Sequence, residues 1–296
     1  MFQKYYNFHE QRKKFYEKFG FIHFFISIGA LIFWVFAFKS SILDANNIPT
    51  SSMVPTLKVG DFLFVNKMRY TLRIPFTEYE LFRIDYPRRG DIVTFLPPES
   101  SGIIDKTLVK RVIGVPGDTI RVEDDEIYVN DMKYPVRKVK NLSILEEYEY
   151  PSIYRELDEK YENTGGGLYK ESIIDPITKE VIVDHYMLKN PREALPSVSL
   201  NLRNPKKIWK IPAKKYMVMG DNRDNSSDSR DWDLIDLEKV QGKVFMIYFS
   251  VNWGSRVDAI NSMREPENPF VNVYYLFKYG GGDAFVRWGR IFDRVY

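Results

Sequence analysis

The sequence contains no cysteine, which excludes disulfide bonds, thiolate metal sites and cysteine nucleophiles. Histidine is almost as scarce: His9 lies in a charged N-terminal segment and His23 in an apolar stretch. Only His185 could reach a soluble active site, and we interpret it as a surface or packing residue because no motif surrounds it in the strand-like segment 181–188. A Ser-His-Asp hydrolase and a multi-histidine metal site are therefore poorly supported.

An excess of charge is also missing. The formal net charge is +3, and no basic stripe with interleaved aromatic residues is present, so we expect no nucleic-acid partner. Aromatic residues, in contrast, make up 16% of the chain, which indicates β structure, a membrane-facing surface, or both. The length of 296 residues allows one large or two modest domains.

Residues 21–38 form a long apolar run, in which only His23 and Ser27 are polar. A helix of this length just crosses a hydrocarbon layer of about 30 Å. A buried core helix is the weaker alternative, because the run is apolar on every side. A cleaved signal peptide is the better one, but bulky Phe36 and Phe38 do not suit a small-x-small cleavage site. We predict a single uncleaved membrane span.

The charges before this run predict its direction. Basic residues outnumber the two acidic ones, Glu10 and Glu17, in residues 1–20. The basic residues are Lys4, Arg12, Lys13, Lys14 and Lys18. By the positive-inside rule we expect a cytoplasmic segment 1–20 and an extracytoplasmic domain after Lys39.

The rest of the chain has a pattern typical of an antiparallel β-sandwich or barrel-like domain, and we predict a mainly β fold. Short alternating segments are separated by turn signals at Gly60, Gly90 and Gly117. The predicted strands cover residues 61–65, 91–95, 107–115, 119–122, 126–129, 215–219 and 244–248.

We assign residues 39–130 and 208–296 to this domain and residues 131–207 to an inserted β-rich subdomain, because that stretch is rich in Lys, Glu and Tyr and contains Gly165–Gly167. The tail from residue 268 onward is aromatic, and two interpretations stay open: core or C-terminal strand residues, or contact with the membrane interface. Its aromatic residues are Tyr274, Tyr275, Phe277, Phe285, Trp288 and Phe292.

Two segments supply a candidate nucleophile and base. In residues 49–56, PTSSMVPT, hydroxyls beside prolines are common in turns, but Ser52 lies shortly after the apolar run. In a strand, Lys110 shares its face with Leu108 and Val112, so burial could lower its pKa and let it accept a serine proton. Alternatively, Lys110 extends to water at a strand edge.

A third segment, residues 217–232, passes from a strand into a dense loop of charges and hydroxyls. Acidic residues at alternate positions could suit calcium, but Arg223 and Arg230 are interspersed and EF-hand spacing is absent. We therefore predict a loop held by Arg–Asp pairs, with Arg111 as a natural partner of Asp228.

Four motifs in this order resemble those of type I signal peptidases, the leader peptidase family. They are TSSMVPT at 50–56, RGDIVTF at 89–95, KRVIGVPGD at 110–118 and GDNRDNSSDSR at 220–230. The resemblance covers roughly residues 20–130 and 208–250. It implies a serine endopeptidase that removes signal peptides from exported pre-proteins through a Ser-Lys dyad.

The resemblance also implies roles for individual residues. Ser52 is the nucleophile and Lys110 the general base, and Ser226 orients the lysine. The Thr50 hydroxyl and the Ser52 amide form the oxyanion hole, although many bacterial members have serine at position 50. Structural support comes from Arg111, Asp228 and Arg230. We expect no metal or organic cofactor, and a monomer whose partners are pre-proteins and the lipid bilayer.

Other functions remain open at this stage. A processing protease of narrower specificity could use the same dyad, and substrate profiling would separate it. A self-cleaving regulator fits less well because of the apolar run. A catalytically silent, membrane-anchored β domain that binds exported chains would fail to react with a serine-directed β-lactam or penem probe.

Overall fold

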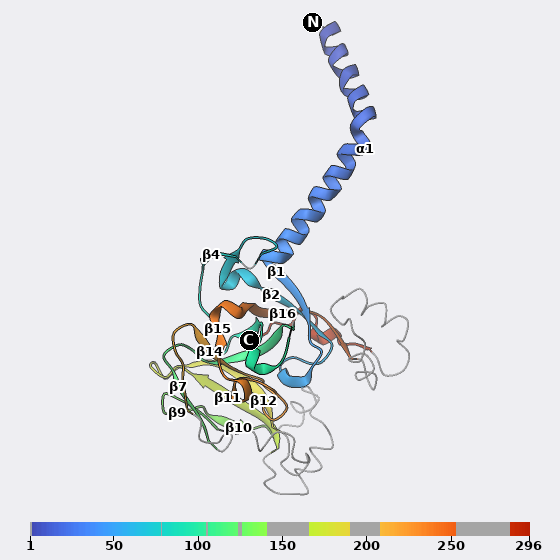
Figure 1. Ribbon diagram of the computed structural model, residues 1–296. Coiled ribbons are helices and arrows are strands. Elements are labelled where there is room, and N and C mark those ends of the chain that lie inside the picture. Colours follow the sequence, from blue (N-terminus) through green and yellow to red (C-terminus); the bar gives the residue numbers. More distant parts are fainter. Residues whose placement is uncertain are drawn as a thin grey trace.

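The fold was obtained as a computed structural model and consists of one long helix and a body of antiparallel strands (Figure 1). This confirms the mainly β architecture with an N-terminal apolar helix. The structure describes residues 2–77, 79–104, 106–123, 126–140, 166–189, 208–252 and 285–296, without the side chains of residues 2–9, 11–18 and 285.

Helix α1 extends from Phe2 to Ser41 and projects away from the body (Figure 1). Its apolar part, Phe19–Ser41, has 23 residues and a mean hydropathy of 2.3, and its most apolar window is only 6% buried. At about 1.5 Å per residue this part is about 35 Å long, which is enough to cross a membrane. The helix begins well before the predicted span, since residues 2–19 contain neither proline nor glycine.

The largest sheet has the order β1-β2-β16-β5-β6-β14-β15, with β17 paired to β16. Its pairings are antiparallel. The sheet contains both the strands that directly follow α1 and strands from the C-terminal part of the described chain. Its strands are β1 (Leu43–Asn47), β2 (Asp61–Asn66), β5 (Ile92–Phe95), β6 (Leu108–Gly114), β14 (Lys215–Met219), β15 (Ile235–Asp236), β16 (Val240–Asn252) and β17 (Phe285–Val286).

Three smaller sheets complete the described β structure: β13-β7-β8-β9, β10-β11-β12 and β3-β4. Their strands are β3 (Thr71–Arg73), β4 (Glu80–Arg83), β7 (Thr119–Glu123), β8 (Glu126–Val129), β9 (Met132–Lys133), β10 (Val136–Lys138), β11 (Gly167–Ile174), β12 (Val181–Lys189) and β13 (Ile208–Lys210). Each predicted strand coincides with a strand of the structure within a few residues, apart from β16, which is longer.

The predicted subdomain 131–207 is only partly described. Its described part contains β9 to β12, while residues 141–165 and 190–207 lie outside the described residues. Strand β9 pairs with β8 of the preceding segment, so the two segments share a sheet. The division into domains stays a prediction.

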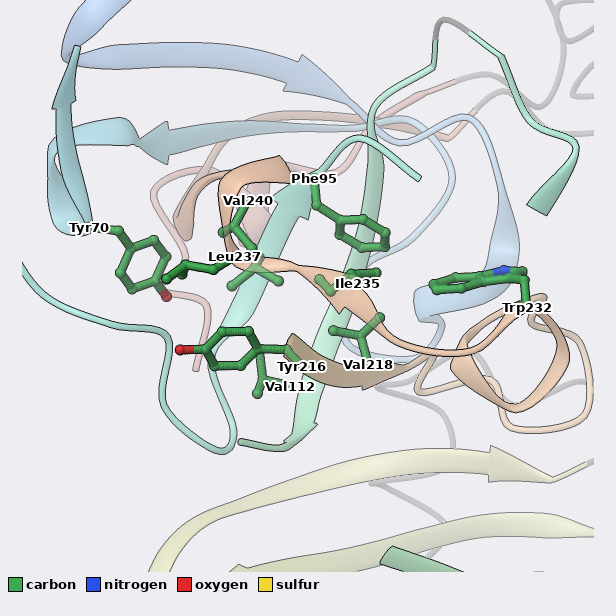
Figure 2. Packing of buried hydrophobic residues seen from close by; sticks show 10 residues of the cluster. Tyr70, Phe95, Val112, Tyr216, Val218, Trp232, Ile235, Leu237 and Val240 are labelled. Carbon is green, nitrogen blue, oxygen red and sulfur yellow. The ribbon is translucent and has the colours of Figure 1, made fainter. Parts of the chain in front are cut away.

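The core around β6 is apolar on both sides of that strand. Val112 packs with Phe95, Val218 and Trp232 in one cluster, which Figure 2 shows, whereas its neighbour Ile113 belongs to a second cluster. The partition follows from the alternation of side chains along a strand. Strand β6 is therefore enclosed, and any polar side chain that it carries near its centre is removed from water.

The described part of the tail is divided: Phe285 lies in the C-terminal strand β17 and Val295 is buried in a core cluster, but two aromatic side chains are exposed. Trp288 and Phe292 are 76% and 69% exposed, which makes the core interpretation wrong for these two side chains. Tyr274, Tyr275 and Phe277 lie outside the described residues, as does the side chain of Phe285.

Candidate active site

Ser52 lies in the short 3-10 helix η1 (Ser51–Met53), between β1 and β2. The helix is held from below by the buried side chain of Met53, which is 1% exposed, and Ser52 itself is half-buried. Three hydrogen bonds connect the helix to the loop after β14, one of them from Asn225 Nδ2 to Ser51 Oγ at 3.0 Å. The Asn222 amide donates to the Ser52 carbonyl at 3.1 Å, and Asn222 Nδ2 donates to the Ser51 carbonyl at 3.1 Å.

Lys110 lies in β6, between β5 and β14, and its Nζ is 2.5 Å from Ser52 Oγ. The residue is only 3% exposed, so the alternative in which it extends to water is wrong. Burial lowers the pKa of Lys110 to about 8, because the charged amine loses its hydration, and this effect exceeds the opposing attraction of the Asp228 carboxylate. A substantial fraction of Lys110 is therefore neutral near physiological pH and able to accept a proton.

Gly220 lets the loop after β14 approach the nucleophile. A Cβ atom at this position would lie 2.2 Å from Ser226 Oγ and 2.4 Å from the Ser52 carbonyl oxygen. Neither contact could be relieved cheaply, since the second involves backbone. A side chain at position 220 would therefore push Ser52 and the loop apart, a constraint that the sequence pattern alone did not reveal.

Asp228 organises this loop. Its carboxylate accepts hydrogen bonds from the Gly220 amide at 3.0 Å, from Ser226 Oγ at 2.8 Å and from Arg230 Nε and Nη2 at 2.8 and 2.7 Å. It also caps the helical turn α4 (Ser229–Trp232). Burial alone would raise the pKa of Asp228, but Arg230 and these hydrogen bonds hold it far below its usual range.

Asp228 thus fixes the hydroxyl that the family resemblance assigns to orienting the lysine. The predicted contact of Ser226 with Lys110 stays a prediction, whereas the pairing of Asp228 with Arg230 is present in the structure.

The predicted pairing of Arg111 with Asp228 is wrong. Arg111 Nε and Nη2 donate instead to the two carboxylate oxygens of Asp221 at 2.9 and 2.8 Å, and both side chains are fully buried. The reason is the alternation along β6, which places Arg111 on the face opposite Lys110, away from Asp228. Burial alone would raise the pKa of Asp221, but Arg111 lowers it to about 2.

A second buried ion pair attaches the β11–β12 hairpin to the same loop. Arg223 pairs with Glu171 of β11, with Nη1 at 3.1 Å from Oε1. Backbone bonds join Leu188 of β12 to Asp221 and Arg223 at 2.8 and 2.9 Å. Through these contacts the β11–β12 hairpin packs beside the loop that contains Gly220.

His185 lies inside this network, so it is a packing residue and not a surface one. Its Nε2 is 3.4 Å from Glu171 Oε2 and 3.6 Å from Asp221 Oδ1. Burial, followed by repulsion from Arg111, lowers the pKa of His185 to about 4. No sequence motif marks this position, because its surroundings are created by the long-range contact between β12 and the loop.

Thr50 is exposed and immediately precedes η1. Its backbone is extended, with φ −124 and ψ 156, and its side chain makes no capping hydrogen bond. Its predicted part in an oxyanion hole stays a prediction. Within the ranges that the structure describes, no cluster of three His, Asp or Glu side chains could hold a metal ion.

Comparisons with known proteins show the family to which the chain belongs. The family model for signal peptidase, peptidase S26, matches residues 21–249. A signal peptidase I from Buchnera aphidicola (subsp. Schizaphis graminum) is 33% identical over 256 residues, which covers 77% of this chain and 75% of that protein. A signal peptidase I from Pseudomonas fluorescens is 32% identical over 233 residues, which covers 74% of this chain and 69% of that protein.

A crystal structure of a signal peptidase I from Enterococcus faecalis covers 54% of this chain and 97% of its own, with 22% identity and a TM-score of 0.28. This TM-score is too low for the superposition to bear on the fold described above.

Proposed function

Because the chain belongs to the signal peptidase S26 family and is a serine peptidase of the signal peptidase I type, we propose that it uses Ser52 as nucleophile and Lys110 as general base. As an S26 peptidase, the protein cleaves signal peptides. The observation that carries the mechanism is the 2.5 Å contact between Lys110 Nζ and Ser52 Oγ, made by a lysine that is almost fully buried.

In the first step Ser52 Oγ attacks the carbonyl carbon of the last signal-peptide residue. Lys110, in its neutral form, takes the proton from the hydroxyl, which an ammonium group could not do. The lowered pKa of Lys110, about 8, supports this role because the neutral form is then accessible without strong alkali. An arginine at this position would stay protonated.

The negative charge that develops on the carbonyl oxygen needs hydrogen-bond donors. We assign this role to the Thr50 hydroxyl and the Ser52 amide. Collapse of the tetrahedral intermediate breaks the peptide bond, and Lys110 returns its proton to the leaving amine. The acyl-enzyme on Ser52 is then hydrolysed by a water molecule that Lys110 deprotonates.

Ser226 supports the mechanism as a positioning residue. Its hydroxyl donates to Asp228, whose negative charge also acts on Lys110. With one proton committed to Asp228, the Ser226 oxygen retains lone pairs that could accept from the lysine. The loop thereby gives Lys110 a fixed orientation toward Ser52.

We further propose that α1 anchors the chain in a bacterial inner membrane with its N-terminus in the cytoplasm. The length and hydropathy of Phe19–Ser41 support the anchor, and the basic residues ahead of it support the direction. Ser52 follows the end of the helix closely in sequence, so the nucleophile remains near the membrane in which signal peptides reside. Tethering raises the effective concentration of enzyme at its substrates.

The decisive experiment measures processing of a pre-protein by the full chain reconstituted in lipid vesicles. Ser52→Ala and Lys110→Ala should each abolish cleavage. Matched controls are Ser227→Ala and Lys239→Ala, because both side chains are exposed and neither belongs to the dyad. Full activity of either dyad variant would overturn the assignment. Profiling a panel of pre-proteins in the same assay separates a general signal peptidase from a processing protease of narrower specificity.

A further inference from the structure

Asn222 contacts both of the peptide groups that flank the Cα atom of Ser52. Its side-chain Nδ2 donates to the Ser51 carbonyl at 3.1 Å, and its backbone amide donates to the Ser52 carbonyl at 3.1 Å. Because a peptide group is planar, a bond that holds its carbonyl also holds its amide. The first bond therefore orients the plane that contains the Ser52 amide, and the second orients the plane that follows Ser52.

The orientation of these two planes determines where the side chain of Ser52 points. The backbone dihedral angles of a residue are the rotations of its two flanking peptide planes about Cα. With both planes held by one residue, the Cβ atom of Ser52 has a fixed direction, and Oγ lies 2.5 Å from Lys110 Nζ. In a trans peptide the amide points away from the carbonyl, so the Ser52 N–H faces away from Asn222 Nδ2.

Asn222 is itself held from the other side by strand β12. The Leu188 amide donates to the Asp221 carbonyl at 2.8 Å, and the Leu188 carbonyl accepts from the Arg223 amide at 2.9 Å. These bonds form a parallel bridge between Leu188 and Asn222. The backbone on both sides of Asn222 is thus bonded to β12, while its own amide bonds to η1, and the residue is only 4% exposed. Both of its donors are therefore fixed in place before a substrate binds.

The side-chain oxygen of Asn222 gives a second, independent observation. Within the part of the chain that the structure describes, Oδ1 is buried and has no hydrogen-bond partner, which costs stability. Leucine has nearly the shape of asparagine and no such oxygen, and the Ser51 carbonyl would keep its bond from the Val54 amide at 3.0 Å. Stability alone would therefore favour leucine here, so the asparagine supplies its Nδ2 donor at a cost in stability, as functional residues commonly do.

We propose that Asn222 is a positioning residue of the cleavage reaction. It holds the Ser52 amide in the orientation that stabilises the oxyanion, and it holds the Ser52 hydroxyl against Lys110. The Ser51 carbonyl accepts from both Val54 and Asn222, which polarises the peptide group and makes the Ser52 amide a stronger donor. The inference rests on the proposed roles of the Ser52 hydroxyl as nucleophile and the Ser52 amide as oxyanion donor.

Asn222→Leu in the full chain tests this role, because it removes Nδ2 and leaves the backbone bond to Ser52 in place. We expect kcat for a soluble peptide to fall about 10–100-fold with KM unchanged, since a misdirected donor loses part of what an absent one would lose. The thermal unfolding midpoint should be equal or higher, and the pH midpoint of kcat/KM should not move. A loss of stability or a moved pH midpoint would indicate a general displacement of η1 and would overturn the proposal, as would a normal kcat.

The matched control is Asn225→Leu, which changes the same residue type in the same loop. Asn225 is exposed, and its Nδ2 donates to the Ser51 hydroxyl at 3.0 Å and not to a peptide group. This variant should lower kcat much less than Asn222→Leu does. An equal loss in the two variants would mean that attachment of the loop in general, and not the orientation of the Ser52 amide, determines the rate.

A peptide aldehyde separates positioning from folding. Ser52 Oγ adds to the aldehyde carbon, and the oxygen of the resulting hemiacetal occupies the oxyanion position, whereas the corresponding peptide alcohol binds without this bond. The ratio of the two affinities does not depend on the fraction of folded protein. Asn222→Leu, and the smaller Asn222→Ala, should lower this ratio by the same factor as kcat, and an unchanged ratio would overturn the inference alone. Ser52→Ala should lose the preference for the aldehyde, and a retained preference would overturn the nucleophile assignment itself.

Discussion

Lys110 and Arg111 are consecutive residues of one strand, and the protein treats their charges in opposite ways. Both are buried, 3% and 0% exposed. Arg111 has a carboxylate directly on its guanidinium, whereas the Lys110 amine contacts the Ser52 hydroxyl and has a lowered pKa. Burial of a charge without a partner in contact is expensive, so the charged form is destabilised on one face of β6 and compensated on the other.

The difference teaches how a buried lysine becomes a base without destabilising its neighbours. On the Lys110 face, the acidic charge of Asp228 is already neutralised by Arg230, which contacts it directly. On the Arg111 face, Asp221 is neutralised by Arg111 itself. Each of these two carboxylates thus has its own arginine, and burial outweighs their attraction for the Lys110 proton.

The largest expected effect comes from exchanging the two roles. Lys110→Arg should lower single-turnover cleavage of a pre-protein by about 10³-fold or more, because a guanidinium cannot serve as a base and general-base catalysis contributes about 10²–10⁴-fold. The reciprocal variant, Arg111→Lys, should retain measurable activity since its side chain does not take part in proton transfer. Near-normal cleavage by Lys110→Arg would contradict the division of roles.

The next effect concerns stability. Arg111→Met leaves the buried Asp221 carboxylate without its partner and should lower the free energy of unfolding by about 3–5 kcal/mol. Urea unfolding of the full chain in detergent micelles, followed by circular dichroism, measures the change. The double variant Arg111→Met/Asp221→Leu should recover most of the loss, because no unpaired charge then remains. A double variant no more stable than the single one would indicate that the pair is not what holds this region.

The family motifs in the sequence predicted Ser52 with Lys110 and the nearby Asp228–Arg230 pair, but not the rest of their surroundings. The alternation of side chains around Lys110 and the hydroxyl of Ser52 could be predicted because both follow from short stretches of sequence. The strands 126–129 and 215–219 were predicted to the residue for the same reason. The ion-pair partner of Arg111 could not be predicted from the sequence, because Asp221 and Asp228 lie in the same loop. The path of that loop after Gly220 places one carboxylate on each side of β6.

Contacts across long sequence separations were missed altogether. The pairing of Glu171 with Arg223 and the burial of His185 depend on the β11–β12 hairpin docking beside Asp221. No propensity or spacing rule places a hairpin against a loop. The same holds for Phe76, whose exposed ring looks like an ordinary loop residue until it is found beside Phe33.

A smaller effect is expected at Thr50, which lies outside both buried networks. Thr50→Ala should lower kcat by about 10²–10³-fold with little change in KM, because a donor to the oxyanion acts mainly in the transition state. Thr50→Ser keeps the hydroxyl and should keep the rate. Steady-state kinetics on a soluble peptide distinguishes these variants, and an equal loss in both would mean that the methyl group and not the hydroxyl matters.

The pH dependence of the normal protein should give the smallest effect. Only neutral Lys110 accepts the serine proton, so kcat/KM should rise about tenfold per pH unit and level off above a midpoint near pH 8. Asp228 raises the pKa of Lys110, so Asp228→Asn should move this midpoint to lower pH.

Stability gives an independent check on the same group. The folded state releases the Lys110 proton at a lower pH than the unfolded state, where the pKa is about 10.5. Between these two values the unfolded state binds more protons, so the contribution of Lys110 to stability should rise with pH across this window. Lys110→Met should remove that rise while leaving the Arg111–Asp221 pair intact. If the rise persisted in Lys110→Met, it would have to come from another group, and the two faces of β6 would differ less in charge than the structure indicates.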